Sequence, residues 1–457
     1  MVDQLCHGLW TIDYGPKTKR MQIDKTTLAD LSIFHSEEEL SVVHFLDHTQ
    51  TGGGRDYLYD MIGKPLASVD AILSNQQIIK ELMQVTDRWP VSITNGTIMV
   101  IARFYESQIN KYPTQPNVFN SFTYKLFNAP DFSLTRYTIT HCIDFIKGMT
   151  QVSTLLKEST QSTQLRIWAE RIDMLLNKGL IPEIGTQSKE EMPNWRILSY
   201  ADFIRFHYKN QIFELIDLYS RIDAFLSLSI ACKKYDFCFP EISLSTQPFI
   251  EATGLYHPLL QTPTSYNVDM SRDKNFLFLT GANMAGKSTF IKAVGVSVYL
   301  AHLGMGVPAT KMQLSLFDGL LSNINVVDNI VKGESYFFNE VQRIRNTIEK
   351  ISDGRNWLIL IDELFKGTNV QDAMKCSTTV IEGLRKMKNV LFILSTHLYE
   401  IGEPLQQYSN IQFRYFETSV QDEQLVFSYQ LKEGISNDRL GYLILRREGV
   451  VELLEKL

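Results

Sequence analysis

Cysteine is scarce in this chain, and the few cysteines form no pairing motif. Five of them, an odd number, are scattered over 457 residues, and no Cys-x-x-Cys pair occurs. The pattern therefore argues against a disulfide framework, a zinc site and a thiol-exchange site. Reduced, mostly buried thiols are typical of a cytosolic protein, so we expect a cytoplasmic location.

A hydrophobic run long enough to cross a membrane is missing as well. The most apolar stretch, from Val294 to Val307, is interrupted by His302 and is far shorter than the roughly 20 residues that a spanning helix needs. The sequence does not open with a signal peptide. We therefore expect no membrane partner.

Basic residues are not in excess either. The formal net charge is −6, whereas a protein that holds nucleic acid through phosphate contacts usually has a basic field. Any DNA contact must then come from a local patch. The composition is that of a folded protein, 44% hydrophobic and 21% charged, and its length favours two or three domains.

Two hydrophobic patterns divide the chain. Residues from about 20 to 240 are mostly helical in periodicity, with breaks at 50–56, 111–121 and 181–194, where Gly, Pro and polar residues cluster. From about 245, short apolar runs such as "NFLFLT" alternate with amphipathic stretches, which is typical of a parallel sheet wrapped by helices. Two strands joined by "SVQDE" and a helix over 438–457 are expected near the end. We predict a mostly α-helical domain over 1–244 and an α/β domain over 245–457.

The segment "TGANMAGKST", residues 280–289, lies between a predicted buried strand and a predicted helix. Gly281 to Ser288 fit the phosphate-binding pattern G-x-x-x-x-G-K-[ST] in the context that this pattern requires. Gly281 and Gly286 allow successive backbone N–H groups to face phosphates, Lys287 can reach the β- and γ-phosphates, and Ser288 can ligate Mg²⁺. A chance match in a glycine-containing turn is the alternative, and the strand before and helix after it disfavour that interpretation.

Hydrolysis of a nucleotide requires further groups, and two later strand ends supply candidates. "LILIDE", residues 358–363, ends in Asp362, which can hold Mg²⁺, and Glu363, which can orient or deprotonate the attacking water. Without the phosphate-binding segment, the two acids would be interpreted as a solvated strand tip. "STH" at 395–397 places His397 as a sensor of the γ-phosphate, although a single His is more often structural.

The order of these motifs is that of ABC-type ATPases, but no Leu-Ser-Gly-Gly signature lies between Ser288 and Asp362. In its place stands "GESYFFNEV", residues 333–341. With this segment, and with Asn283 and Met284 inside the phosphate-binding loop, the chain resembles the MutS family of DNA mismatch-repair ATPases. The resemblance extends upstream to "YHPLL" (256–260) and, more moderately, to residues 22–34, 45–58 and 64–72, which resemble the start of the family's helical core.

The resemblance implies roles for further residues. Ser335, Phe337 and Glu340 match the segment that a partner subunit presents to the γ-phosphate in trans. Gly367 and Thr368 match a Gly-Thr pair at the dimer seam. Residues that the resemblance implies to bind ATP are Gly281, Asn283, Met284, Gly286, Lys287, Ser288, Thr289, Ser335 and Tyr266, the last about where an aromatic ring stacks on adenine.

The chain also departs from the family pattern. Ala282 and Ala285 stand where Pro and Gly are usual, and Phe365, Lys366 and Asn369 stand where Gly, Arg and Ser are common. Hydrolysis is therefore expected to be slower or differently coupled. The family's long members place a mismatch-reading domain before the helical core, whereas here the core pattern begins almost at the start of the sequence. Phe-x-Glu triplets inside the core and ATPase patterns are interpreted as chance.

Three functions are compatible with these residues. The first is a MutS-like, ATP-dependent DNA-binding protein of DNA maintenance, an ATPase whose homodimer switches its helical levers and shows weak or no mismatch preference. The alternative is an ATP-driven dimeric switch that acts on protein partners, such as repair proteins, without direct mismatch recognition. The third is a nucleotide-binding scaffold without turnover, which Glu363 disfavours.

Overall fold

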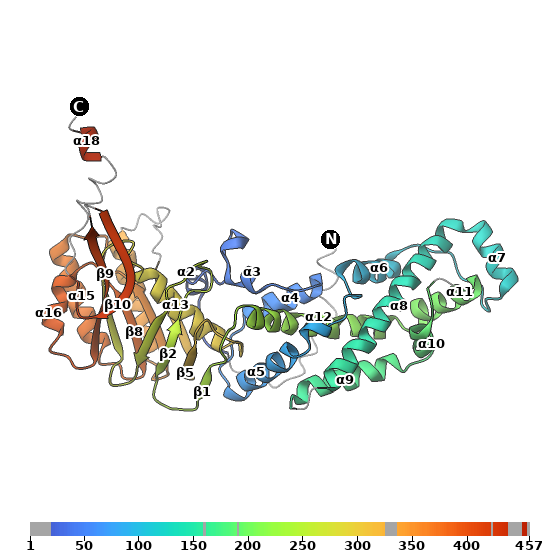
Figure 1. Ribbon diagram of the computed structural model, residues 1–457, viewed down its shortest axis with the longest axis horizontal. Helices are drawn as coiled ribbons and strands as arrows, with labels where there is room; N and C mark the ends of the chain where they lie inside the picture. Colours follow the sequence, from blue (N-terminus) through green and yellow to red (C-terminus); the bar gives the residue numbers. More distant parts are fainter. Residues whose placement is uncertain are drawn as a thin grey trace. The chain divides into compact units, whose positions relative to one another are not determined.

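The computed structural model describes residues 20–158, 161–189, 192–324, 336–421, 424–436 and 450–454 (Figure 1). A helical region from 20 to 235 is followed by mixed α/β sheets, as predicted. By packing, the chain separates into two compact units. The helical unit comprises residues 43–63 and 74–237, and the sheet unit comprises the described residues of 1–42, 64–73 and 238–457. The division into domains 1–244 and 245–457 stays a prediction, because packing units and domains need not coincide.

The helical unit is built from helices of unequal length (Figure 1). Its longest members are α8 (Ala129–Lys157) and α12 (Lys209–Lys234), and their inward residues join one hydrophobic core, for example Ile143 and Leu215. The other α-helices that lie wholly within it are α4 (Gly52–Ile62), α6 (Asn95–Glu106), α7 (Val118–Phe127), α9 (Thr163–Leu176), α10 (Ile181–Thr186) and α11 (Asn194–Asp202). It also contains a short 3₁₀ turn, η2 (Thr86–Arg88), and a short π-helix, η3 (Phe203–His207). Helix α5 (Val69–Met83) begins in the sheet unit and continues into the helical unit.

The break expected at 50–56 is right only for Gln50 and Thr51, because α4 begins at Gly52 and includes all three glycines of "TGGGRD". Thr51 caps the helix by accepting a hydrogen bond from the N–H of Gly54 at 3.0 Å. The glycines are explained by α12. A Cβ atom on Gly53 would lie 2.4 Å from Ser220 Oγ, and one on Gly54 would lie 2.1 Å from Asp223 Oδ2. These glycines therefore allow close helix packing rather than a turn.

Asp223 fixes the start of α4 to α12. Its fully buried carboxylate accepts hydrogen bonds from the N–H groups of Gln50 at 3.0 Å and Thr51 at 2.9 Å, and from the Thr51 hydroxyl at 2.7 Å. Burial raises the pKa of Asp223, and these hydrogen bonds act in the opposite direction. The loop before α4 thus obtains its backbone partners from a helix more than 150 residues later in the chain.

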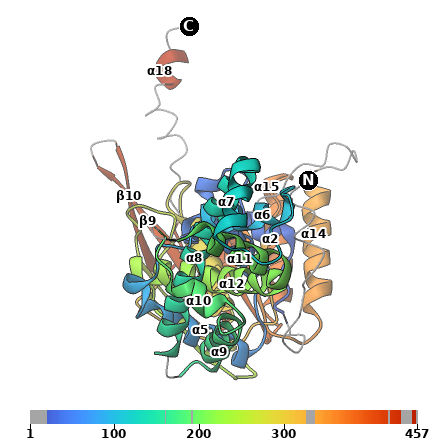
Figure 2. The same ribbon diagram turned by 90° about the vertical axis from the view of Figure 1, so that its right-hand side faces the viewer.

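The sheet unit contains a six-stranded sheet in the order β10-β9-β4-β8-β7-β6, parallel except for β10. Its strands are β4 (Phe276–Thr280), β6 (Gly319–Asn323), β7 (Trp357–Asp362), β8 (Val390–Ser395), β9 (Ile411–Gln421) and β10 (Gln424–Glu433). Helices α14 (Tyr336–Ile351) and α15 (Val370–Leu384) pack on the face that includes Ile359 and Phe392. Helix α13 (Lys287–Ala301) packs on the other face, where a Cβ on Gly295 would lie 2.6 Å from Leu360. Figure 2 shows the β9–β10 hairpin at one side of this sheet and α14 at the other.

A second, four-stranded sheet was not predicted. Its order is β1 (Glu241–Ser243), β5 (Lys311–Ser315), β2 (Ile250–Leu255) and β3 (Tyr266–Met270). The residues near the N-terminus also belong to the sheet unit. Gln22 pairs with Gly319 of β6, and Asp30, at the end of α2 (Lys25–Asp30), accepts hydrogen bonds from the N–H of Ile324 at 3.0 Å and from the Ser322 hydroxyl. These residues therefore pack along the β6 edge of the larger sheet.

Some predictions fall on parts of the chain that are not described. Of the helix expected over 438–457, only α18 (Val450–Leu454) lies within the described residues.

Within the described ranges, no helix combines the length and apolar character needed to cross a bilayer. Helix α7 exposes large apolar side chains, namely Val118, Phe119, Phe122, Leu126 and Phe127. The described residues do not show what covers them.

Candidate nucleotide site

The sheet brings three of the predicted motifs to one edge. Strands β4, β8 and β7 are neighbours and run parallel, so their carboxyl ends meet. Ser395 pairs in register with Leu279 of β4 and with Asp362 of β7. The phosphate-binding loop, the Asp-Glu pair and the "STH" segment therefore follow adjacent strand ends, which is where ligands bind in sheets of this type.

The phosphate-binding loop has the backbone that its glycines predict. Gly281 and Gly286 have φ of 141° and 108°, in the region that glycine adopts without steric cost, and Met284 has φ of 67°. Asn283 and Met284 are exposed, whereas Ala282 and Ala285 are buried. Helix α13 begins at Lys287, so its unpaired N–H groups and positive dipole end face the loop, which suits an anion. Thr289, in the first turn, is half-buried.

Lys287 is buried at the centre of the loop, with 5% of its surface exposed. Its ammonium group donates hydrogen bonds to the carbonyl oxygens of Gly281 at 2.8 Å and Ala282 at 2.9 Å, and it lies 3.4 Å from Nε2 of His397. Burial lowers the pKa of Lys287 to about 8, although the carboxylates of Glu363 and Asp362 act in the opposite direction. The cation is thus positioned where the loop would enclose a phosphate.

Asp362 lies between two hydroxyl groups. Ser288 donates a hydrogen bond to Oδ2 of Asp362, and Ser395 donates one to Oδ1. A carboxylate beside a hydroxyl is the oxygen donor set that Mg²⁺ prefers, so the residues present fit the metal that the sequence predicts. Sequence reasoning missed Ser395, although its place in "STH", directly before a predicted strand end, was a usable signal.

Glu363 contacts the imidazole of His397 and the ammonium group of Lys366. Its Oε1 atom lies 2.8 Å from Nε2 of His397, and its Oε2 atom lies 3.2 Å from Nζ of Lys366. Burial by itself raises the pKa of Glu363, but the hydrogen bond and charge of His397, together with Lys366, outweigh it and lower the pKa to about 2. Glu363 is therefore ionised, as a residue that orients water must be. The geometry gives His397 a contact with both Glu363 and Lys287.

The aromatic residue predicted to face adenine is largely covered. Tyr266 is 6% exposed, and its ring lies edge-on to the rings of Phe290 and Phe416, at centroid distances of 5.3 Å and 5.7 Å. Another aromatic side chain, which sequence reasoning missed, lies beside the loop. Tyr429 of β10 is 43% exposed and has φ of 54°, and its ring would lie 3.4 Å from a Cβ on Gly286. The assignment of Tyr266 to adenine stays a prediction.

The segment predicted to act across a dimer seam is only partly described. Ser335 lies outside the described residues. Glu340 is buried, and its carboxylate accepts hydrogen bonds from the N–H groups of Lys366 at 3.1 Å and Gly367 at 3.2 Å of the same chain. Phe337 packs against Phe365, with a centroid distance of 5.7 Å. Phe337 and Glu340 thus contact the loop that follows the Asp-Glu pair within one chain.

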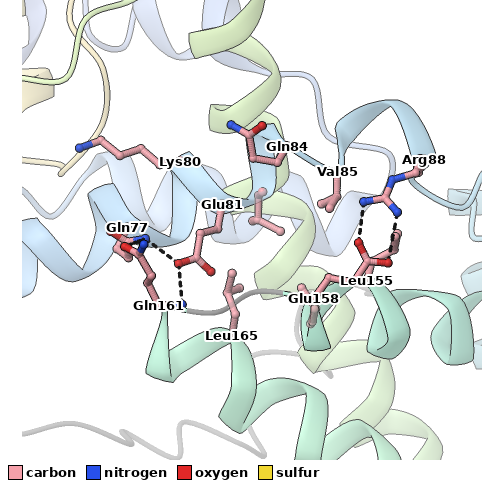
Figure 3. A pocket seen from close by; sticks show the side chains of 12 residues that line it. Gln77, Lys80, Glu81, Gln84, Val85, Arg88, Leu155, Glu158, Gln161 and Leu165 are labelled. Atoms are coloured by element: carbon pink, nitrogen blue, oxygen red, sulfur yellow. Dashed lines mark hydrogen bonds and ion pairs between the residues drawn. The ribbon is translucent and has the colours of Figure 1, made fainter.

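A pocket in the helical unit is a weaker candidate (Figure 3). It has a volume of about 310 Å³ and is lined by residues of α5, α8 and α9. Its charged groups already have partners. Arg88 forms a bidentate pair with Glu158 at 3.1 Å and 2.7 Å (Figure 3). Glu81 accepts one hydrogen bond from the N–H of Gln161 and another from the N–H of Ser162. The strand ends of the sheet unit therefore remain the best-supported site.

Comparisons with known proteins agree with this geometry. Residues 277–452 match the family described as MutS domain V. The chain is 28% identical over 256 residues to the DNA mismatch repair protein MutS of Petrotoga mobilis. The matched region covers 54% of this chain and 31% of that protein. It is 30% identical over 263 residues to the DNA mismatch repair protein MSH3 of Vanderwaltozyma polyspora, covering 54% of this chain and 25% of that protein.

A third relative has a different description. The chain is 29% identical over 239 residues to the human MutS protein homolog 4, covering 50% of this chain and 25% of that protein. The chain thus spans about a third or less of the length of these curated relatives. What the comparisons establish is that this protein carries a MutS-family ATPase domain and is distantly related to MutS and MSH proteins over about half of its length.

Proposed function

We propose that this chain binds and hydrolyses ATP at the edge formed by β4, β8 and β7. The observation that carries the proposal is the convergence of Lys287, Asp362, Glu363 and His397 at three adjacent strand ends. Such an arrangement combines a phosphate-binding cation, a metal-binding carboxylate and a water-orienting carboxylate. The match to a MutS ATPase domain supports the same reaction.

Each side chain has a distinct task in this mechanism. Lys287 and the N–H groups of residues 281–286 bind the phosphates, and Ser288 and Asp362 would hold Mg²⁺. Bound Mg²⁺ would neutralise charge that develops on the phosphates. Glu363 orients the attacking water, and His397 fixes the Glu363 carboxylate through the contact of 2.8 Å. Lys287 lies 3.4 Å from His397 and interacts electrostatically with Glu363. Phosphate bound by Lys287 would therefore change the electrostatic environment of the two groups that act on water.

We further propose that ATP occupancy drives a MutS-like switch in a homodimer formed through the ATPase domains. Ser335 would complete the partner's site, and the domain over 1–244 would act as a lever on DNA. Relatives named as mismatch repair proteins favour DNA as the partner. The net charge of −6 favours the alternative, in which the switch acts on protein partners without direct mismatch recognition.

The ATP site is tested by Lys287→Ala, with Lys292→Ala on the same helix as the matched control. We expect ATP and Mg²⁺ to raise the melting temperature of the wild type and of Lys292→Ala, and to leave that of Lys287→Ala unchanged. Phosphate release should be lost only in Lys287→Ala. Equal stabilisation of both variants by ATP would contradict the assignment of the site.

A further inference from the structure

The loop that follows the Asp-Glu pair has a backbone that its own residues disfavour. Glu363 and Phe365 have φ of 65° and 59°, in the left-handed region. Side chains with a Cβ atom rarely adopt this region, and neither residue is among the few types that tolerate it. At position 365, the family that this chain resembles commonly has Gly. The conformation of residues 363–367 must therefore be stabilised by contacts from outside the loop.

Helix α14 supplies these contacts. The two carboxylate oxygens of Glu340 each accept one backbone N–H, from Lys366 at 3.1 Å and from Gly367 at 3.2 Å. One turn earlier on the same helix, Phe337 packs its ring against that of Phe365, which is 4% exposed. Glu340 is itself 5% exposed. A buried carboxylate that holds two successive N–H groups constrains a loop strongly, because its removal leaves both donors unpaired.

We propose that Glu340 is a positioning residue for ATP hydrolysis and that Phe337 supports it by holding Phe365. Together the three side chains form a clasp between α14 and the loop that carries Glu363. The inference rests on the proposed ATPase activity and names a residue that sets its rate without touching ATP. In the sequence, Glu340 resembles part of a segment presented to a partner. Its carboxylate is engaged within its own chain, and the role of the segment in trans stays a prediction.

The clasp affects the rate of hydrolysis rather than ATP affinity, because it contacts the loop that carries Glu363 and not the side chain of Lys287. Lys366, whose N–H is held by Glu340, also places its ammonium 3.2 Å from Glu363. Releasing the loop therefore displaces Glu363 and its partner together. A misplacement of about 1 Å in a catalytic group can lower a rate by about 10²-fold. Lys287 is held by carbonyl groups of the phosphate-binding loop. The hydrogen bonds and the ring contact that define the clasp join α14 to residues 365–367.

Three variants test the clasp. Glu340→Ala removes both acceptors, and Glu340→Gln keeps the size of the side chain and one acceptor. Glu349→Gln is the control, since Glu349 is an exposed residue of the same helix that pairs with Arg345 at 2.9 Å. We expect kcat for ATP to fall by between about tenfold and about hundredfold in Glu340→Ala, with a smaller fall in Glu340→Gln. The Kd of a fluorescent ATP analogue should change by less than about twofold in all three.

A double substitution separates positioning from general stability. Phe337→Ala should lower kcat in the wild-type background, where Phe365 needs support. In a Phe365→Gly background it should have little effect, because glycine adopts the left-handed backbone without help. A merely structural role would lower folding stability in both backgrounds without this dependence of kcat on residue 365.

The possible failures are distinguishable. A wild type that binds no ATP or releases no phosphate would overturn the proposed function itself. An active wild type with a folded Glu340→Ala of equal kcat would overturn the clasp alone, as would a parallel loss of ATP affinity and kcat in Glu340→Gln. If Glu340→Ala does not fold, the clasp is tested by Glu340→Gln and by Phe337→Ala in the wild-type and Phe365→Gly backgrounds.

Discussion

Lys287 places its ammonium group in a buried position, where loss of hydration disfavours the protonated form. Burial lowers its pKa to about 8, so a fraction of the side chain is neutral in mildly alkaline solution. Binding of phosphate requires the charged form. The negative charges of ATP raise the pKa of a cation that they contact. Between the two pKa values, the complex therefore retains a proton that the free protein has lost.

We predict that ATP affinity falls as the pH rises above about 8 and that binding takes up protons there. Titration calorimetry at about pH 8.5, in two buffers of different ionisation enthalpy, measures the proton uptake. Lys287→Arg is the control, because a guanidinium stays charged in this range and should remove the dependence. Proton release, or an affinity that is constant across this range, would contradict the pKa assigned to Lys287.

At the scale of elements, one buried carboxylate of α12, that of Asp223, accepts the hydrogen bonds of the residues that start α4. Asp223→Ala leaves the N–H groups of Gln50 and Thr51 and the Thr51 hydroxyl without their acceptor. We predict that it lowers the free energy of unfolding by about 2–4 kcal/mol, measured by urea denaturation. Asp87→Ala breaks an exposed pair with Lys233 and should have a much smaller effect. Equal stability losses in the two variants would contradict the role of Asp223.

Local sequence signals predicted most of these elements, and nonlocal packing explains where they failed. Apolar runs predicted β4, β7 and β8, and the motif predicted that Lys287 and Asp362 lie near one another. The three glycines at 52–54 indicated a turn, because glycine allows backbone conformations that turns require. In the structure, Gly53 and Gly54 are explained by the close approach of α12, which no local sequence pattern reveals.

The contacts of the site that escaped prediction are also nonlocal. Ser395 contacts Asp362 because β7 and β8 are adjacent, and strand order is not written in the motifs. Glu340 was assigned by resemblance to a contact in trans, and its partners in the same chain, Lys366 and Gly367, are recognisable only once α14 is placed on the sheet. The roles of the individual site residues in binding and hydrolysis remain predictions.

At the scale of the whole molecule, the proposed homodimer leads to a prediction about shared sites. The role of Ser335 in trans rests on resemblance, because this residue lies outside the described ranges. Lys287→Ala and Ser335→Ala should each be inactive alone. Mixed in equal amounts, they should recover up to about a quarter of the wild-type sites, because half of random dimers are mixed and each has one intact site. Mixed dimers that form and remain inactive would contradict a composite site.

DNA binding is the second prediction at this scale. Discriminating a mismatch requires a kink stabilised by an inserted side chain. The Phe-x-Glu triplets of the given sequence lie inside the core and ATPase patterns and are interpreted as chance. We predict at most a weak preference for a mismatched duplex and an affinity that falls steeply with salt. Fluorescence anisotropy with matched and mismatched duplexes across a salt series measures both. A strong mismatch preference would reveal a missed recognition element, and no binding at low salt would favour protein partners.

Glu363→Gln tests the central claim, hydrolysis of ATP by this site, most directly. The change removes the carboxylate that we propose to orient water and leaves the contacts of Lys287 with the phosphate-binding loop in place. In a single-turnover experiment with ATP and Mg²⁺, we predict wild-type affinity for ATP and phosphate release slowed by about 10²-fold or more. Phosphate release by Glu363→Gln at the wild-type rate would contradict the account, because the catalytic carboxylate would then lie elsewhere.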